Sequence, residues 1–69
     1  MAQFYIDAAD PEADVRRCHD SMRDRQRITI TGATLEGRLL PFTGVVQAIE
    51  DNGEGAPRGK RWRVTMQDL

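Results

Sequence analysis

Cysteine and histidine are almost missing from this chain of 69 residues, which has one of each, adjacent at Cys18 and His19. A lone cysteine cannot form an intramolecular disulfide, which fits a reducing compartment, and the pair is too small for a structural zinc site. Neighbours on a helix point about 100° apart, so these two do not form a nucleophile–base dyad. We therefore expect Cys18 to be a packing residue, and we expect no metal and no cofactor.

Long apolar runs are also missing. The purely apolar runs are two or three residues long, which is too short to span a bilayer. The N-terminus lacks the basic start and apolar stretch of a signal peptide. We therefore expect a cytoplasmic protein with no membrane partner.

An excess of one charge sign is missing as well, because the formal net charge is −1. This argues against a dedicated binder of polyanions, but the charges are segregated along the chain. Residues 1–14 carry four acids and no base, whereas residues 58–63 carry four cations. A chain of this length is expected to form one small domain, residues 1–69, with a thin core.

The clearest local signal predicts a helix over residues 10–25. Asp10 can accept a backbone N–H as a cap, and Pro11 suits the first helical position. Four side chains recur at helical spacing and predict a stripe that packs on a sheet: Val15, Cys18, His19 and Met22. Residues 1–9 are predicted to be an extended arm or a strand.

Residues 27–67 are predicted to form an antiparallel sheet. In its last strand, Trp62, Val64 and Met66 alternate with Arg61, Arg63 and Thr65, which gives one apolar and one polar face. Residues 38–50 form either one long bent strand or two strands broken near Pro41, because proline cannot donate to a central ladder. The pattern does not decide which of Val45 and Val46 faces inward. Residues 51–59 are rich in glycine and acid and are predicted to be a mobile loop.

Together these elements predict an α+β fold, with an N-terminal helix packed on a strongly bent antiparallel sheet of three to five strands. Curling so small a sheet into a barrel hides its edges best. The pattern over residues 28–66 resembles SH3-like small β-barrels, and the nine arginines against one lysine resemble short, uncharacterised proteins of GC-rich bacteria. Sm-like RNA-binding barrels share the layout. Their glycine–asparagine signature has no match in residues 58–66, so no RNA-contact residues are transferred.

Catalytic motifs are missing from the sequence, so we do not expect an enzyme. There is no Ser-His-Asp set, no phosphate-binding glycine loop and no pair of converging carboxylates. Four residues offer oxygen ligands but lack the spacing of a calcium-binding loop: Glu50, Asp51, Asn52 and Glu54. A solvated turn is the expected structure there.

The candidate contact residues are four cations near the last strand: Arg58, Lys60, Arg61 and Arg63. Cations beside an indole suit a phosphate backbone and a stacked base. Trp62, however, shares a face with Val64 and Met66, which favours a core indole with the arginines in water.

We therefore predict a non-catalytic module for interaction with a protein partner or for self-association, through edge strands and the arginine face. The alternative is a weak nucleic-acid-binding module that uses the same four cations. A third, more distant hypothesis is a redox or small-molecule role for Cys18.

Overall fold

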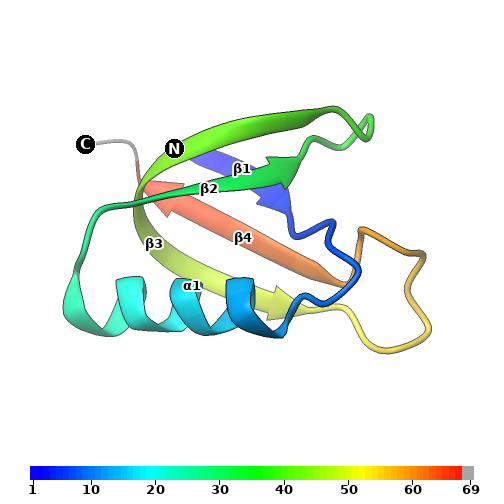
Figure 1. Ribbon diagram of the computed structural model, residues 1–69, viewed down its shortest axis with the longest axis horizontal. Helices are drawn as coiled ribbons and strands as arrows, with labels where there is room; N and C mark the ends of the chain where they lie inside the picture. Colours follow the sequence, from blue (N-terminus) through cyan, green and yellow to red (C-terminus); the bar gives the residue numbers. More distant parts are fainter. Residues whose placement is uncertain (68–69) are drawn as a thin grey trace.

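The computed structural model describes residues 1–67, which form one helix and four strands. In chain order these are β1 (Ala2–Tyr5), α1 (Glu12–Asp24), β2 (Ile28–Ala33), β3 (Leu39–Asp51) and β4 (Trp62–Gln67), as shown in Figure 1. Of the two predictions for residues 1–9, the strand is the one observed. The helix is therefore the second element of the chain and not the first.

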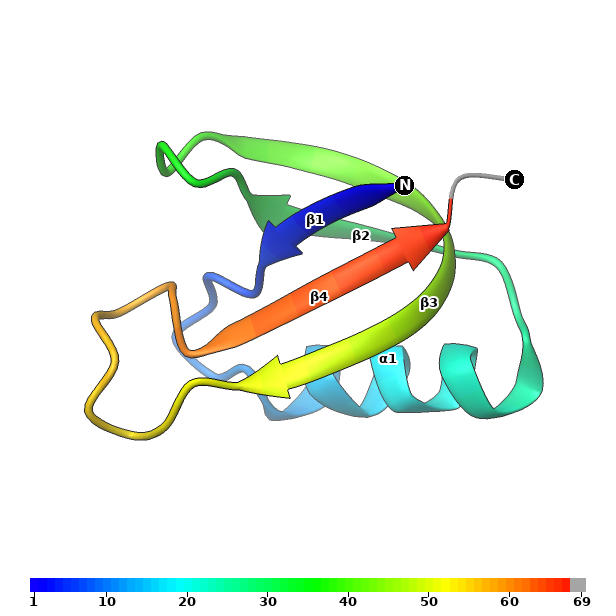
Figure 2. The same cartoon turned by 180° about the vertical axis from the view of Figure 1, so that it is seen from behind.

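The four strands pair antiparallel and join into a ring in the order β1-β2-β3-β4 (Figure 2). The long β3 is continuous and bent: its first half pairs with β2 and its second half with β4. β1 pairs with β4 along its whole length but meets β2 only at Tyr5 and Ala33. The predicted α+β fold with a strongly bent antiparallel sheet is confirmed.

Two local features allow β3 to bend. Gly44 lies where the strand passes from β2 to β4, and a Cβ there would clash with the carbonyl oxygen of Gln67. Only glycine permits this close approach of two backbones. A register shift between Val46 and Ala48 then inserts a bulge, which increases the local twist of the strand.

The beginning of α1 lies one residue later than predicted: the helix starts at Glu12, and Pro11 rather than Asp10 is its N-cap, without a side-chain capping hydrogen bond. The backbone of Pro11 is already helical (φ −76°, ψ −7°), and the Asp10 carboxylate accepts the Glu12 N–H at 3.3 Å. The helix ends at Asp24, and Arg25 then adopts the left-handed conformation with φ 54°. The predicted range of residues 10–25 therefore includes the flanking residues of the helix as well as the helix itself.

One member of the predicted helical stripe is wrong. Cys18 is completely buried, and Val15 and Met22 pack against the core, but His19 is exposed. Ser21 is completely buried in its place. The spacing of apolar residues predicted that His19, and not Ser21, belongs to the buried face of the helix. The centre of that face instead lies between Cys18 and Ser21.

Ser21 joins the end of the helix to the bulge in β3. Its hydroxyl donates to the carbonyl oxygen of Gln26 and accepts the N–H of Val46 at 3.1 Å. The buried hydroxyl thus satisfies a strand N–H in the interior, where an unpaired donor would be costly.

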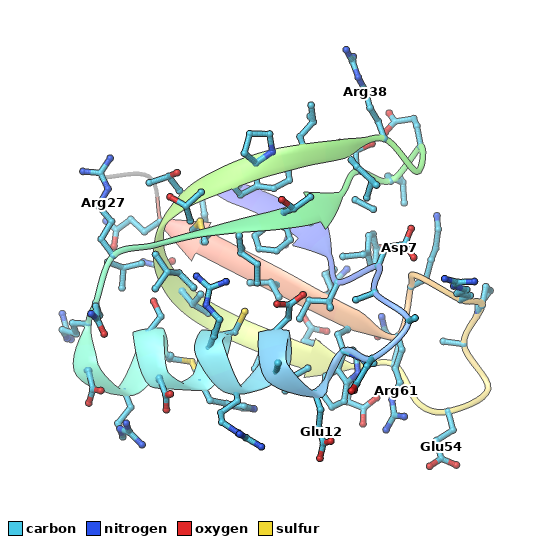
Figure 3. All side chains as sticks on the ribbon, viewed as in Figure 1. Asp7, Glu12, Arg27, Arg38, Glu54 and Arg61 are labelled. Carbon is cyan, nitrogen blue, oxygen red and sulfur yellow. The ribbon has the colours of Figure 1, made fainter. Side chains whose placement is uncertain are left out.

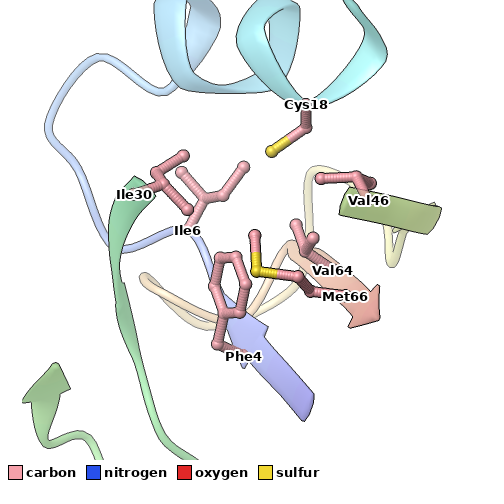
Figure 4. Close-up of a cluster of buried hydrophobic side chains, with 7 residues drawn as sticks. All are labelled: Phe4, Ile6, Cys18, Ile30, Val46, Val64 and Met66. Atoms are coloured by element: carbon pink, nitrogen blue, oxygen red, sulfur yellow. The ribbon is translucent and has the colours of Figure 1, made fainter. Parts of the chain in front are cut away.

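The core fills the ring and is closed on one side by α1 (Figure 4). It consists of seven buried side chains: Phe4, Ile6, Cys18, Ile30, Val46, Val64 and Met66. Val46, and not Val45, is the valine that faces inward. The alternation predicted for β4 is confirmed for Val64 and Met66, while Trp62 is half-buried at the edge of this core.

Candidate functional site

Two of the candidate arginines are paired with acids of β3: Arg61, which directly precedes β4, and Arg63 within β4. Arg61 binds Asp51 with two hydrogen bonds, Nε to Oδ1 at 2.8 Å and Nη2 to Oδ2 at 3.1 Å. This pairing raises the pKa of Arg61, and together with the Gly53 N–H it lowers the pKa of Asp51. The two charges therefore neutralise each other at the surface of the hairpin.

Arg63 is used in a similar way. Its Nη2 donates to Glu50 Oε1 at 2.7 Å, and this contact raises the pKa of Arg63. Its Nε is buried and has no hydrogen-bond partner among residues 1–67, so this donor is hidden from an approaching ligand. The arginine face of β4 is thus electrically neutralised by β3.

The other two predicted cations lie outside this paired surface. Lys60 Nζ donates to the carbonyl oxygen of Leu35 at 2.9 Å and lies 5.5 Å from the centroid of the Tyr5 ring. Arg58 is exposed and forms no ion pair with any of residues 1–67. The structure therefore does not gather the four candidate residues into one free basic patch.

A groove between the start of α1 and the start of β4 was not predicted from the sequence. Its volume is about 330 Å³, and we call it the Trp62 groove. Three apolar and three charged residues line it: Pro11, Val15, Trp62, Asp10, Glu12 and Arg61. Figure 3 shows Glu12 and Arg61 at the same end of the molecule, beside the loop that carries Glu54.

The position of Trp62 in β4 explains why its indole reaches this groove. Val64 and Met66 fill the middle of the ring, whereas Trp62 is the first residue of the strand and pairs with Asp51 at the end of β3. Its indole therefore lies partly exposed at the edge of the core. Arg61 covers part of it, with Cζ 4.9 Å from the ring centroid, in a cation–π contact.

The charge around the Trp62 groove is negative. The two acids that line the groove form no ion pair with any of residues 1–67: Asp10 and Glu12. Arg61, the cation of the groove, is neutralised by Asp51. The positive end of the helix dipole, about half a charge, offsets only part of this excess. The groove thus has the opposite sign from the basic surface that the sequence predicted here.

Cys18 lies at the centre of the core and is completely buried (Figure 4). Burial, with a smaller contribution from the nearby Asp14, raises the pKa of its thiol to about 11. The reactive thiolate is therefore scarce at neutral pH. Its environment favours the packing role over the redox role.

The part of the chain that the structure describes, residues 1–67, has no group of three His, Cys, Asp or Glu residues placed to hold a metal ion. Nor does any helix in those residues have the length and apolar character needed to cross a bilayer. Comparison of the chain with family models, curated proteins and solved structures gave no match. Function must therefore be inferred from the groove and its charges.

The sequence did contain a signal for this groove. The acid-rich segment around Asp10 and Glu12 predicts the start of a helix, and the alternation of the last strand favours Trp62 as a core residue over one that stacks on a nucleic-acid base. A tryptophan at the first position of a strand lies at the edge of the sheet, where few core side chains cover its indole. The indole therefore extends past the core. What could not be read from the sequence is that α1 begins beside that same strand end.

Proposed function

We propose that this chain is a non-catalytic protein-interaction module that binds its partner in the Trp62 groove. The observation that carries the proposal is the partly exposed indole, which lines the groove together with the apolar side chains of Pro11 and Val15. A domain of this size has a thin core, so leaving its one indole partly in water sacrifices stabilising burial. Tryptophan is also among the residues that contribute most to binding at protein interfaces.

The contacts of the arginines support a protein partner over a nucleic acid. A phosphate would have to displace Asp51 from Arg61 and Glu50 from Arg63, and two charge-assisted contacts would be lost. Weak nucleic-acid binding through Arg58, Lys60, Arg61 and Arg63 is thus the less favoured proposal. Chemical-shift changes in residues 58–63 on adding short RNA or DNA at low salt would support it.

Self-association is a second candidate, supported by two exposed apolar side chains on the β2–β3 hairpin. Leu35 is 66% exposed and Leu39 is 57% exposed, and both lie away from the Trp62 groove. Pairing these side chains with a second copy would remove apolar surface from water. Sedimentation of the pure protein over a range of concentrations tests this, and a monomer at every concentration contradicts it.

We also propose that the ring of strands is an SH3-like small barrel. The support is the shared β3, which pairs with β2 through one half and with β4 through the other, so that a single strand turns the corner of the sheet. An experimentally determined structure in which β1 and β2 lie apart would contradict a closed barrel.

The protein-interaction proposal is tested with a random heptapeptide library displayed on phage. The only tryptophan of the chain lies in the groove, so its fluorescence reports on that site directly. We expect the selected peptides to share a pattern and to shift the emission of Trp62. Selected peptides that leave the emission unchanged, and instead shift amides elsewhere, would contradict the proposal.

A further inference from the structure

We infer that the occupant of the Trp62 groove is a cationic segment of a partner protein, in which an apolar side chain contacts Trp62 and Val15 and a neighbouring arginine or lysine pairs with Asp10 and Glu12. This inference rests on the proposed function and specifies the chemistry of the partner. It follows from the way apolar and charged side chains are divided around the groove.

The apolar part of the groove has room for a side chain but not for a large cofactor. Its volume of about 330 Å³ lies near the lower limit of roughly 300 Å³ for small-molecule pockets. Trp62 and Val15 both pack against the core, so their positions are fixed before a partner arrives. A preformed apolar surface of this kind accepts one aliphatic or aromatic side chain with little ordering cost.

The charged part of the groove selects the sign of the partner. Glu12 is exposed, and its carboxylate forms no ion pair within residues 1–67; the Asp10 carboxylate makes one contact, with the Glu12 N–H at 3.3 Å. A guanidinium group can bind such a carboxylate with two parallel hydrogen bonds. An acidic segment would instead meet two like charges, which disfavours its binding.

Arg61 does not reverse this preference. Its guanidinium is held by both oxygens of Asp51, so the pair adds no net charge to the groove. The same contact keeps Arg61 against the indole of Trp62, at 4.9 Å from the ring centroid. Arg61 is therefore a fixed part of the groove lining, and the lining carboxylates that form no ion pair within residues 1–67 belong to Asp10, just before α1, and Glu12, its first residue.

Three synthetic pentapeptides, acetylated and amidated at their ends, test the inference on the full chain. The sequences are Gly-Arg-Leu-Arg-Gly, the acidic Gly-Glu-Leu-Glu-Gly and the apolar-deleted Gly-Arg-Ser-Arg-Gly. We expect only the first to shift the emission of Trp62 strongly, with an affinity that falls as salt is added. The serine peptide should bind about tenfold more weakly, because its apolar contact is lost.

A matched pair of variants separates a local from a general charge effect. Glu12→Gln should weaken binding of the first peptide by about two- to fivefold, the range for an exposed ion pair. Glu36→Gln removes the same charge from an exposed residue outside the groove and should leave binding unchanged. Circular dichroism of both variants confirms that they are folded.

The outcomes distinguish this inference from the proposed function. If the acidic peptide shifts Trp62 as much as the basic one, or if Glu36→Gln weakens binding as much as Glu12→Gln, the cationic partner is wrong while the groove still binds peptides. If none of the three peptides moves Trp62, the cationic partner is also wrong. In that case, library-selected peptides of another composition that shift Trp62 would leave the proposed function standing.

Discussion

The two ends of α1 differ in what their polar groups do. At the C-terminal end, the Ser21 hydroxyl bonds both Gln26 and Val46, and the Ser21 carbonyl oxygen accepts the N–H groups of Arg25 and Gln26. At the N-terminal end, Asp10 makes one contact at 3.3 Å, and Glu12 forms no ion pair among residues 1–67. At the first end Ser21 is paired within the fold, whereas the second end lies beside the indole of Trp62 and offers charge to the surroundings.

This difference separates structural polar groups from those available for binding. A polar group that is paired inside the fold contributes to stability, and its loss leaves a partner unsatisfied. A polar group beside an apolar groove with no internal partner contributes little to stability. Substitutions at the two ends should therefore differ in their effect on unfolding, and the following predictions test that contrast.

The largest expected effect comes from a pair of glycines at opposite ends of the molecule. Gly44→Ala should lower the free energy of unfolding by about 3 kcal/mol or more, because the added Cβ overlaps the backbone of Gln67. Gly55 lies in the loop beside the start of α1, and a Cβ added there would meet no atom within 4 Å, so Gly55→Ala should change stability by less than about 1 kcal/mol. Urea denaturation measures both, and equal losses would refute the contrast.

A smaller effect is expected at the two polar ends of the helix. Ser21→Ala leaves the buried Val46 N–H without a partner and should cost about 2 kcal/mol. Asp10→Ala removes the exposed hydrogen bond from the Glu12 N–H and should cost about 0.5–1 kcal/mol. Hydrogen exchange provides a second readout, since the Val46 amide should exchange faster in Ser21→Ala and not in Asp10→Ala. The comparison fails if Asp10→Ala is the more destabilising variant.

The smallest effect involves Cys18, which lies between the two ends and belongs to neither. Its folded pKa of about 11 lies above the reference value of 9.0, so folding holds the thiol protonated. This contribution to stability is fully present below pH 9 and is lost as the pH rises from about 9 to about 11. The denaturation midpoint should fall over this range less steeply in Cys18→Ala than in the parent protein. Parallel pH curves for the two proteins would show that the thiol is not perturbed.

The elements that the sequence predicted well are those set by local chemistry. Asp10 and Pro11 mark the start of α1, and the alternation of Val64 and Met66 places β4 on the core. These signals involve neighbouring residues only. The choice between one strand and two near Pro41 depended on pairing with β2 and β4, which a single sequence does not display.

The site was less predictable, because it depends on contacts between distant segments. The pairing of Arg61 with Asp51 follows from the register of the β3–β4 hairpin, and this register was hidden by the long loop between the strands. Likewise, the bond from Val46 to Ser21 spans 25 positions and arises at a bulge. The sequence prediction overestimated the free positive charge of Arg61 and Arg63, because it did not include their pairing with Asp51 and Glu50 of β3.

The closure of the ring at Tyr5 and Ala33 has a consequence for the motions of the molecule. One residue pair joins β1 to β2, whereas four pairs join β1 to β4 and six join β2 to β3. Thermal opening should begin at this seam and convert the ring into an open ribbon of four strands with β1 still attached to β4. The N-terminal strand β1 can therefore separate from β2 while it stays paired with β4. This separation would expose the side of Phe4 that contacts Gly32.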